Sequence, residues 1–214
     1  MYRRSLAVLG LLLTIPFGAV AAPPQGQPYI ELPITLEVES PNKVEVREFF
    51  WYGCSHCYSL EPGIESWLKR KPANATFVRT PAAVGSWALH AQAYYAFETL
   101  GVLERVHVPF FKAIHQQNRR FNNEAAIAQF AVEHGIDNAR FREAFNSFGV
   151  RLKLDKARRL YEAAGIDGVP NLVIAGKYVT SPGIAGDPET MFKVVDELVK
   201  KAGRAPAKPA KNAK

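Results

Sequence analysis

Residues Glu48–Tyr58 have the sequence EFFWYGCSHCY and hold the only two cysteines of the 214-residue chain, Cys54 and Cys57. The apolar, aromatic run before the cysteines is typical of a buried strand, and a helical pattern follows them. Because no further cysteine exists, the pair is a redox couple, half of a metal site or a local structural disulfide. A C-x-x-C motif between a strand and a helix favours the redox couple.

Cys54 is expected at the N-terminus of the helix, where unpaired backbone N–H groups and the helix dipole stabilise a thiolate. A protonated His56 adds a positive charge beside it, and such surroundings lower a cysteine pKa from about 8.5 to roughly 3.5–7.5. For a pKa of about 4–5, the reduced form gains roughly 3–4 kcal/mol at pH 7, or about 60–90 mV. The pair should therefore donate its disulfide, with Cys54 as nucleophile and Cys57 as resolving thiol.

Other uses of the two cysteines fit the sequence less well. Covalent haem attachment needs a histidine directly after the second cysteine, where this chain has Tyr58. A structural zinc site needs four ligands, and the histidines of the chain lack paired zinc spacing. We interpret four of them as ordinary residues on helix surfaces: His90, His107, His115 and His134.

Residues 1–21 have the pattern of a secretory signal peptide. Arg3 and Arg4 precede the apolar segment Leu6–Ile15, and an A-x-A site at residues 19–21 predicts cleavage after Ala21. The alternative is an uncleaved membrane anchor, but an apolar run of about 17 residues is at the short limit for a span. We expect an exported, periplasmic protein, in an oxidising compartment where a C-x-x-C disulfide persists.

The net charge of +7 lies mainly at the two ends of the chain. Without Arg3 and Arg4 it is +5, and without the four basic residues of segment 204–214, which has no acid, it is +1. This distribution argues against a nucleic-acid surface. The Ala-, Pro- and Lys-rich segment 204–214 is predicted to be a disordered tail.

Residues 28–82 show a strand pattern followed by a β-α-β pattern. Strands are expected at 34–38, 44–52 and 75–80, with a helix from Cys54 to about Lys71. Residues 83–164 show almost only helical patterns, which we divide at four positions: Gly101, Asn122, Gly135 and near Gly149. Asn122 and Asp137 are expected to be N-caps. Apolar residues at helical spacing are expected in the core: Trp87, Ala91, Tyr94, Tyr95, Ile127, Phe130, Ala131, Phe141, Phe145, Phe148, Leu154, Ala157, Leu160 and Tyr161.

Strand character returns in residues 165–203. A hairpin is expected at 172–181 around Gly176-Lys177, followed by a helix that Asp187 caps and Pro188 opens. A β-α-β half followed by a β-β-α half predicts an α/β fold with a mixed sheet of four or five strands and helices on its faces. The helical block 83–164 is then an insertion between the halves.

These features together resemble the DsbA family of periplasmic thiol oxidases. The resemblance rests on Phe49-Phe50, Cys54-Ser55-His56-Cys57-Tyr58, the helical insertion, Gly168-Val169-Pro170 and Gly176-Lys177-Tyr178, and it spans about residues 31–201. The best-known family motif has proline where this chain has Ser55. The resemblance implies a thioredoxin fold at 28–82 and 165–203 with an inserted all-helical subdomain at 83–164. It also implies a monomer that the membrane partner DsbB reoxidises by passing electrons to quinone.

The resemblance also implies roles for residues outside the cysteine pair. Val169-Pro170 should be a cis-proline loop that faces the cysteines and, with Ser55, contacts an extended substrate chain; the alternative is an ordinary trans proline at the start of a strand. Glu48 matches a family position where a buried acid under the active site relays protons, and its alternative is a solvated or salt-bridged strand residue. No metal is implied, and no cofactor besides the redox-active disulfide.

Two other functions remain open on the sequence alone. An isomerase or reductase of the same fold would use the same cysteines, although isomerases of this kind usually carry an N-terminal dimerisation domain, for which the segment before Glu31 is short. A peptide- or metal-binding module would need no redox chemistry. We predict a protein dithiol oxidase, which donates its Cys54–Cys57 disulfide to newly exported cysteine-containing proteins.

Overall fold

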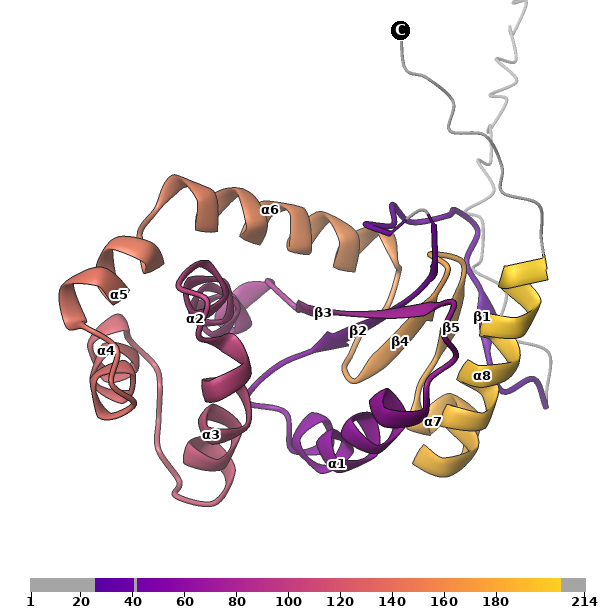
Figure 1. Ribbon diagram of the computed structural model, residues 1–214, viewed down its shortest axis with the longest axis horizontal. Helices are drawn as coiled ribbons and strands as arrows, with labels where there is room; N and C mark the ends of the chain where they lie inside the picture. Colours follow the sequence, from indigo (N-terminus) through magenta and orange to yellow (C-terminus); the bar gives the residue numbers. More distant parts are fainter. Residues whose placement is uncertain (1–25, 41, 205–214) are drawn as a thin grey trace, which may run out of the picture.

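The computed structural model describes residues 26–40 and 42–204 (Figure 1). The expected signal peptide at 1–21 lies outside the described residues, and so does the expected tail after Arg204. Within the described part, no helix combines the length and the apolar character that a membrane span requires.

A five-stranded mixed sheet forms the centre, with the strands in the order β1-β5-β4-β2-β3. Strands β2 and β3 are parallel, and the other neighbouring pairs are antiparallel. The bounds of the strands are Ile30–Glu31 for β1, Val44–Phe50 for β2, Ala75–Pro81 for β3, Asn171–Ile174 for β4 and Tyr178–Thr180 for β5. The thioredoxin-like arrangement expected from the sequence is therefore confirmed.

Helices cover both faces of this sheet, as Figure 1 shows. Helices α1 (Ser55–Arg70) and α8 (Pro188–Arg204) pack on one face, where Val46 of β2 meets Ile64 and Trp67 of α1 and Val195 of α8. Side chains alternate along a strand, so Phe49 points to the other face and packs against Tyr161 of α6. Glu48, between Val46 and Phe50, consequently lies on the face that α1 covers.

A block of helices lies between β3 and β4 in the chain. It starts with a 3-10 turn, Gly85–Trp87, and contains α2 (Ala88–Thr99), α3 (Leu103–His115), α4 (Glu124–Glu133), α5 (Asn138–Phe145) and α6 (Phe148–Ala163). Its core is aromatic, and the following side chains are fully buried: Phe97, Phe110, Phe111, Phe130 and Phe141. Phe50 and Tyr52 belong to the same cluster, so the core of the insertion extends to the strand that leads into Cys54.

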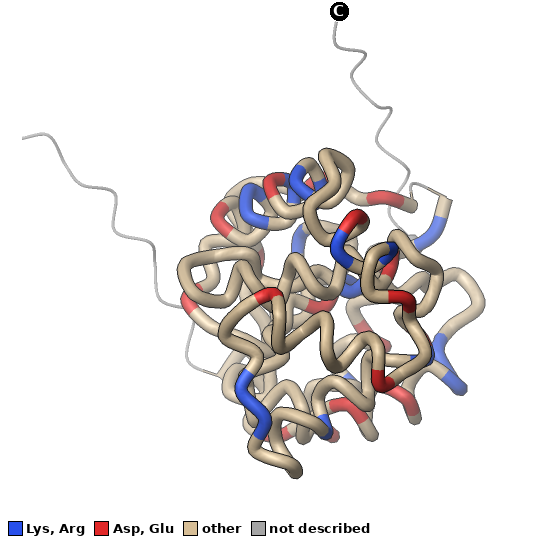
Figure 2. The backbone as a smooth tube through the Cα atoms, turned by 90° about the vertical axis from the view of Figure 1, so that its left-hand side faces the viewer, with Lys and Arg blue, Asp and Glu red and all other residues tan. Residues whose placement is uncertain are grey.

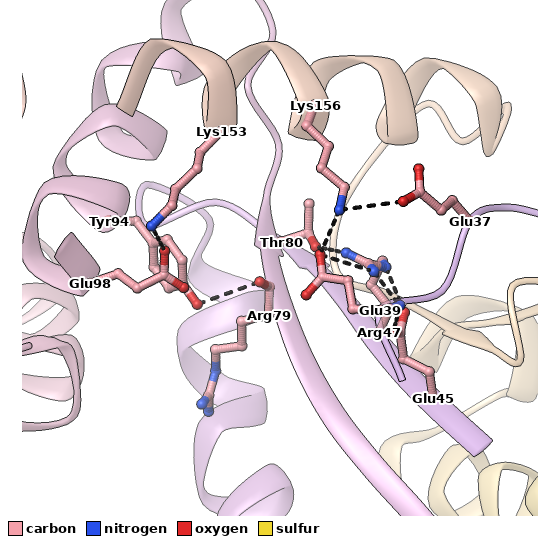
Figure 3. Close-up of polar contacts among 10 residues, drawn as sticks. All are labelled: Glu37, Glu39, Glu45, Arg47, Arg79, Thr80, Tyr94, Glu98, Lys153 and Lys156. Atoms are coloured by element: carbon pink, nitrogen blue, oxygen red, sulfur yellow. Dashed lines mark hydrogen bonds and ion pairs between the residues drawn. The ribbon is translucent and has the colours of Figure 1, made fainter. Parts of the chain in front are cut away.

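Polar contacts join α6 to α2 and to the segment that precedes β2 (Figure 3). Lys153 pairs with Glu98 of α2 at 2.8 Å, and Lys156 pairs with Glu39 at 3.2 Å. These side chains are exposed, so each pair contributes little to stability. The buried Arg47 of β2 also lies 3.5 Å from Glu39, so Glu39 faces both α6 and the central sheet.

The expectation of a strand at 34–38 was wrong. The first strand is instead the short β1, and Pro33, which lacks a backbone N–H, follows it closely. The segment after Pro33 packs on the hairpin turn, where the Leu36 N–H donates to the Gly176 carbonyl at 2.8 Å. Gly176 has φ +66°, and a Cβ there would lie 2.4 Å from the Leu36 oxygen, so this contact requires glycine.

Three details of the helical block also differ from the expectation. Asn123 rather than Asn122 caps α4, and α6 begins after its cap Ser147, so that Gly149 lies inside the helix. Phe148 is 67% exposed rather than part of the core, because it occupies the first position of α6. Outside the block, the short helix α7 (Pro182–Ala185) was not expected either. The caps at Asp137 and Asp187 are confirmed.

Acidic and basic residues are interspersed over the face of the molecule that Figure 2 shows. No extended area of a single charge sign stands out on that face among the residues drawn in colour.

Candidate active site

The two cysteines occupy different environments at the start of α1. Cys54 is the N-cap residue and is partly exposed, whereas Cys57 is buried in the first turn. The Cys54 sulfur accepts a hydrogen bond from the Cys57 backbone N–H at 3.2 Å. Both are free thiols in this structure. The geometry therefore presents one thiol to a substrate and keeps the other behind it.

The same geometry separates the acidities of the two thiols. The pKa of Cys54 is lowered to about 6, mainly by a hydrogen bond from the Cys57 thiol. The backbone amides of Cys57 and His56 and the charge of His56 also lower this pKa, whereas burial raises it. Burial raises the pKa of Cys57 far above its usual range. At pH 7 Cys54 is therefore mostly a thiolate and Cys57 a thiol, as expected for a nucleophile and a resolving residue.

His56 is exposed, and the two backbone amides and the Cys57 thiol contribute more to the low pKa of Cys54 than its imidazole does. We therefore expect His56→Ala to raise the Cys54 pKa from about 6, but not to the ordinary value of about 8.5. The measurement is a pH titration of thiolate absorbance in the ultraviolet. Lys69→Ala, which removes an exposed cation from the far end of α1, is the matched control. An unchanged titration would contradict any role of the imidazole.

The loop before β4 completes the site. The peptide bond Val169-Pro170 is cis, as expected, and the Cys54 thiol donates to the Val169 carbonyl at 3.4 Å. A groove of about 470 Å³ runs between this loop, the start of α1 and α7, and its lining includes His56, Leu60, Val169, Pro170, Asn171 and Pro182. Ser55 is exposed at the helix start and does not line this groove.

Glu48 lies under the active site and is fully buried. It stands directly opposite Arg79 in the pairing of β2 with β3, and its Oε2 is 3.3 Å from the Arg79 Nε. Burial raises the pKa of Glu48 to about 8, against the effect of Arg79. Glu48 is thus not solvated: it is a buried carboxyl beside Arg79 whose raised pKa favours the protonated form at pH 7.

A chain of buried polar groups continues from Arg79 to the helical block. Arg79 Nη2 is 3.0 Å from Glu61 of α1, Glu61 is 3.4 Å from the Nε2 of His107, and the Nδ1 of His107 is 2.8 Å from the Tyr52 hydroxyl. Burial raises the pKa of Glu61, but the contacts with His107 and Arg79 lower it by more, so the pKa lies below its usual value. Burial lowers the pKa of His107. Glu61, Arg79 and Tyr52 were not predicted from the sequence as residues of the site.

The expectation of surface histidines was wrong for His107, which is buried, whereas His90, His115 and His134 are partly exposed. His115 Nε2 lies 2.8 Å from the Tyr52 carbonyl, and His90 Nε2 lies 3.0 Å from the Phe121 carbonyl. The His115 contact joins the turn before Cys54 to α3, and the His90 contact lies within the helical block. Among residues 26–40 and 42–204, no three His, Cys, Asp or Glu side chains form a group that could hold a metal ion.

Comparisons with known proteins assign the family. A family model described as the DSBA-like thioredoxin domain matches residues 79–193. The thiol:disulfide interchange protein DsbA of Azotobacter vinelandii is 41% identical over 175 residues, which cover 81% of this chain and 82% of that protein. The chain belongs to the DsbA family. DsbA of Pseudomonas aeruginosa is 40% identical over 184 residues, with 86% and 87% of the two chains covered.

Solved structures of DsbA proteins agree with this assignment. The crystal structure of Pseudomonas aeruginosa DsbA superimposes with a TM-score of 0.79 at 39% identity, covering 83% of this chain and 93% of that one. DsbA of Xylella fastidiosa gives a TM-score of 0.78 at 29% identity, covering 86% and 99%. The chain is accordingly a thiol:disulfide oxidoreductase of the disulfide-forming type, with the DsbA version of the thioredoxin fold, and its substrates are thiol-containing proteins.

Proposed function

We propose that the oxidised Cys54–Cys57 pair accepts electrons from dithiols of unfolded, exported proteins in two exchange steps. A substrate thiolate attacks the Cys54 sulfur, which forms a mixed disulfide and releases Cys57. A second substrate thiolate then attacks the substrate sulfur of that mixed disulfide, and Cys54 leaves as a thiolate. The substrate gains one disulfide, and the protein is left with two reduced cysteines. The low pKa of Cys54, which makes it a good leaving group, is the observation that carries this proposal.

Cys57 must take up a proton when it is released, because burial disfavours its thiolate. Glu48 is a suitable donor, since its pKa of about 8 leaves it protonated at pH 7 and it lies on the face of β2 that α1 covers. We assign to Glu48 the role of a buried proton store for Cys57. Arg79, at 3.3 Å, stabilises the carboxylate that remains.

The substrate is proposed to bind as an extended chain along the Val169-Pro170 loop. The Val169 carbonyl faces Cys54, so its backbone can pair with a substrate segment as a short added strand. The adjoining groove offers mainly apolar and small side chains. It is suited to one or two apolar residues of the substrate. Ser55, exposed at the helix start outside this groove, is proposed to contact the substrate chain next to Cys54.

The signal pattern at residues 1–21 supports a periplasmic location after cleavage. Each catalytic cycle leaves the dithiol form, so a continuous supply of oxidant is required. We propose a quinone-linked membrane oxidase of the DsbB type as that supply and a monomer as the working form. A redox-active disulfide is the only cofactor in this scheme.

The test is oxidation of a reduced dithiol peptide by the oxidised protein, without and with membranes that contain a quinone-linked thiol oxidase. We expect one peptide disulfide per protein molecule without membranes and continuous turnover with them. The competing isomerase function predicts rearrangement of scrambled disulfides instead. A protein that rearranges scrambled disulfides readily but leaves the dithiol peptide reduced would contradict the proposal.

A further inference from the structure

A second cavity lies beside Gly53, the residue before Cys54, on the side of the helical block. Its volume is about 600 Å³, and its lining includes Trp51, Gly53, Ser86, His90, Arg119 and Arg120. Gly53 directly precedes Cys54, whereas the groove beside Val169-Pro170 begins at His56. A substrate chain that crosses Cys54 therefore has one hollow on the side of the cis-proline loop and another on the side of the insertion.

One wall of this second cavity is aromatic and rigid. The Trp51 ring stacks on Trp87 at 4.9 Å between centroids and on His90 at 5.9 Å. It also covers the backbone of Gly53, where a Cβ would lie 2.2 Å from the indole. Only glycine can precede Cys54 while the Trp51 ring occupies this position. The cavity therefore depends on specific packing of these residues.

The charged side chains that line the cavity are both arginines, and no acidic side chain lines it. Arg119 is held by Glu133 and lies over the Phe121 ring, 5.0 Å from its centroid. Arg120 is exposed and has no hydrogen bond or ion pair with any side chain in the described part of the chain. It is thus available to a ligand, and a carboxylate is the ligand that an arginine favours.

We propose that this cavity is a second substrate site, which takes an Asp or Glu side chain near the reacting cysteine of the substrate, and that Arg120 determines this preference. The inference rests on the proposed function, because it requires an extended substrate at Cys54. It adds a selection by charge that the apolar groove beside Val169-Pro170 does not provide. Attraction of this kind acts mainly on the rate of association and weakens with salt.

The experiment measures oxidation rates of three dithiol peptides that differ only in the residue next but one to the reacting cysteine: Glu, Gln or Lys. Each peptide is made in two versions, with the varied residue two positions before or two positions after the reacting cysteine. The oxidised full-length protein is mixed with peptide in excess, and its reduction is followed by acid-quenched chromatography. We expect the Glu peptide to react roughly threefold to tenfold faster than the Lys peptide at low salt, in at least one of the two positions, and the difference to shrink at high salt.

The variants Arg120→Glu and Ser86→Glu, which place a carboxylate in the cavity from two different elements, should both abolish or invert this Glu-to-Lys ratio. Arg140→Glu is the matched control, since it makes the same change of charge at an exposed arginine of α5. The ratio cancels any common effect of a variant on the redox potential. A ratio that Arg120→Glu leaves unchanged, or that Arg140→Glu lowers equally, would overturn the inference. A wild-type protein that fails to oxidise even the Gln peptide would instead refute the proposed function.

Discussion

Cys57→Ala is expected to accumulate as a mixed disulfide with its substrates, whereas Cys54→Ala should be inert towards them. Cys54 is partly exposed with a pKa of about 6, so it reacts as a thiolate, and Cys57 is the group that would resolve the product. In Cys54→Ala the remaining thiol is buried and its pKa is raised. We expect its reaction with a model disulfide to be slower by at least about 1,000-fold at pH 7.

The measurement is the rate at which each single-cysteine variant reacts with an aromatic disulfide, together with acid-trapped gels after incubation with oxidised unfolded protein. Equal trapping by the two variants would contradict the assignment of Cys54 as nucleophile. The double variant, which has no thiol, sets the background of both measurements.

Glu48→Gln is expected to stabilise the reduced protein at neutral pH. Burial raises the pKa of Glu48 from 4.5 to about 8 in the folded state, so folding takes up a proton between these two values. The free energy of unfolding therefore falls as the pH rises from about 4.5 to 8. At pH 7 the loss amounts to about 3 kcal/mol, and glutamine, which resembles the protonated acid, does not incur it.

Urea unfolding of the wild type and Glu48→Gln, with the cysteines reduced, tests this pH dependence. We expect the variant to be more stable by about 2–3 kcal/mol at pH 7 and by much less near pH 4.5. Glu65→Gln is the control, because Glu65 is half-exposed at 3.9 Å from Arg79 and should change stability by less than about 1 kcal/mol. A variant that is destabilised at pH 7, or whose advantage does not vary with pH, would contradict the raised pKa.

Local patterns predicted the elements that carry the two cysteines and the facing loop. The apolar run before Cys54 became β2, and the turn at Gly176-Lys177 became the hairpin of β4 and β5. The cap at Asp187 is a hydrogen bond between residues three positions apart. Such features depend on neighbouring residues, so the sequence contains the information directly.

The sequence alone could not predict the buried polar chain under the site. Tyr52 and His107 are 55 residues apart, and a histidine on a helix shows no sign of its partner until the helix is packed. Glu61 of a helix and Arg79 of an edge strand are charged residues that a sequence pattern places at the surface. Both are largely buried here, where they pair with each other and Glu61 also faces His107 of α3. Long-range packing decided their burial, and their acidities followed from it.

The low pKa of Cys54 was predicted in direction, but its size was not. The value of about 6 is higher than the 4–5 considered from the motif. Relative to a cysteine pKa of about 7, as in thioredoxin, it stabilises the reduced state at pH 7 by up to about 1 kcal/mol, and solvent screening of this half-exposed group reduces that figure. Thiolate stabilisation therefore supplies at most about 20 mV of oxidising power over thioredoxin.

The most direct test of the central claim, that this pair is an oxidant, is its redox potential in equilibrium with glutathione at pH 7. We expect a value between about −250 mV, which follows from the Cys54 thiolate, and about −120 mV, which the strongest oxidants of this fold reach. A potential at or below the roughly −270 mV of thioredoxin would contradict the claim, since the pair would then be a reductant.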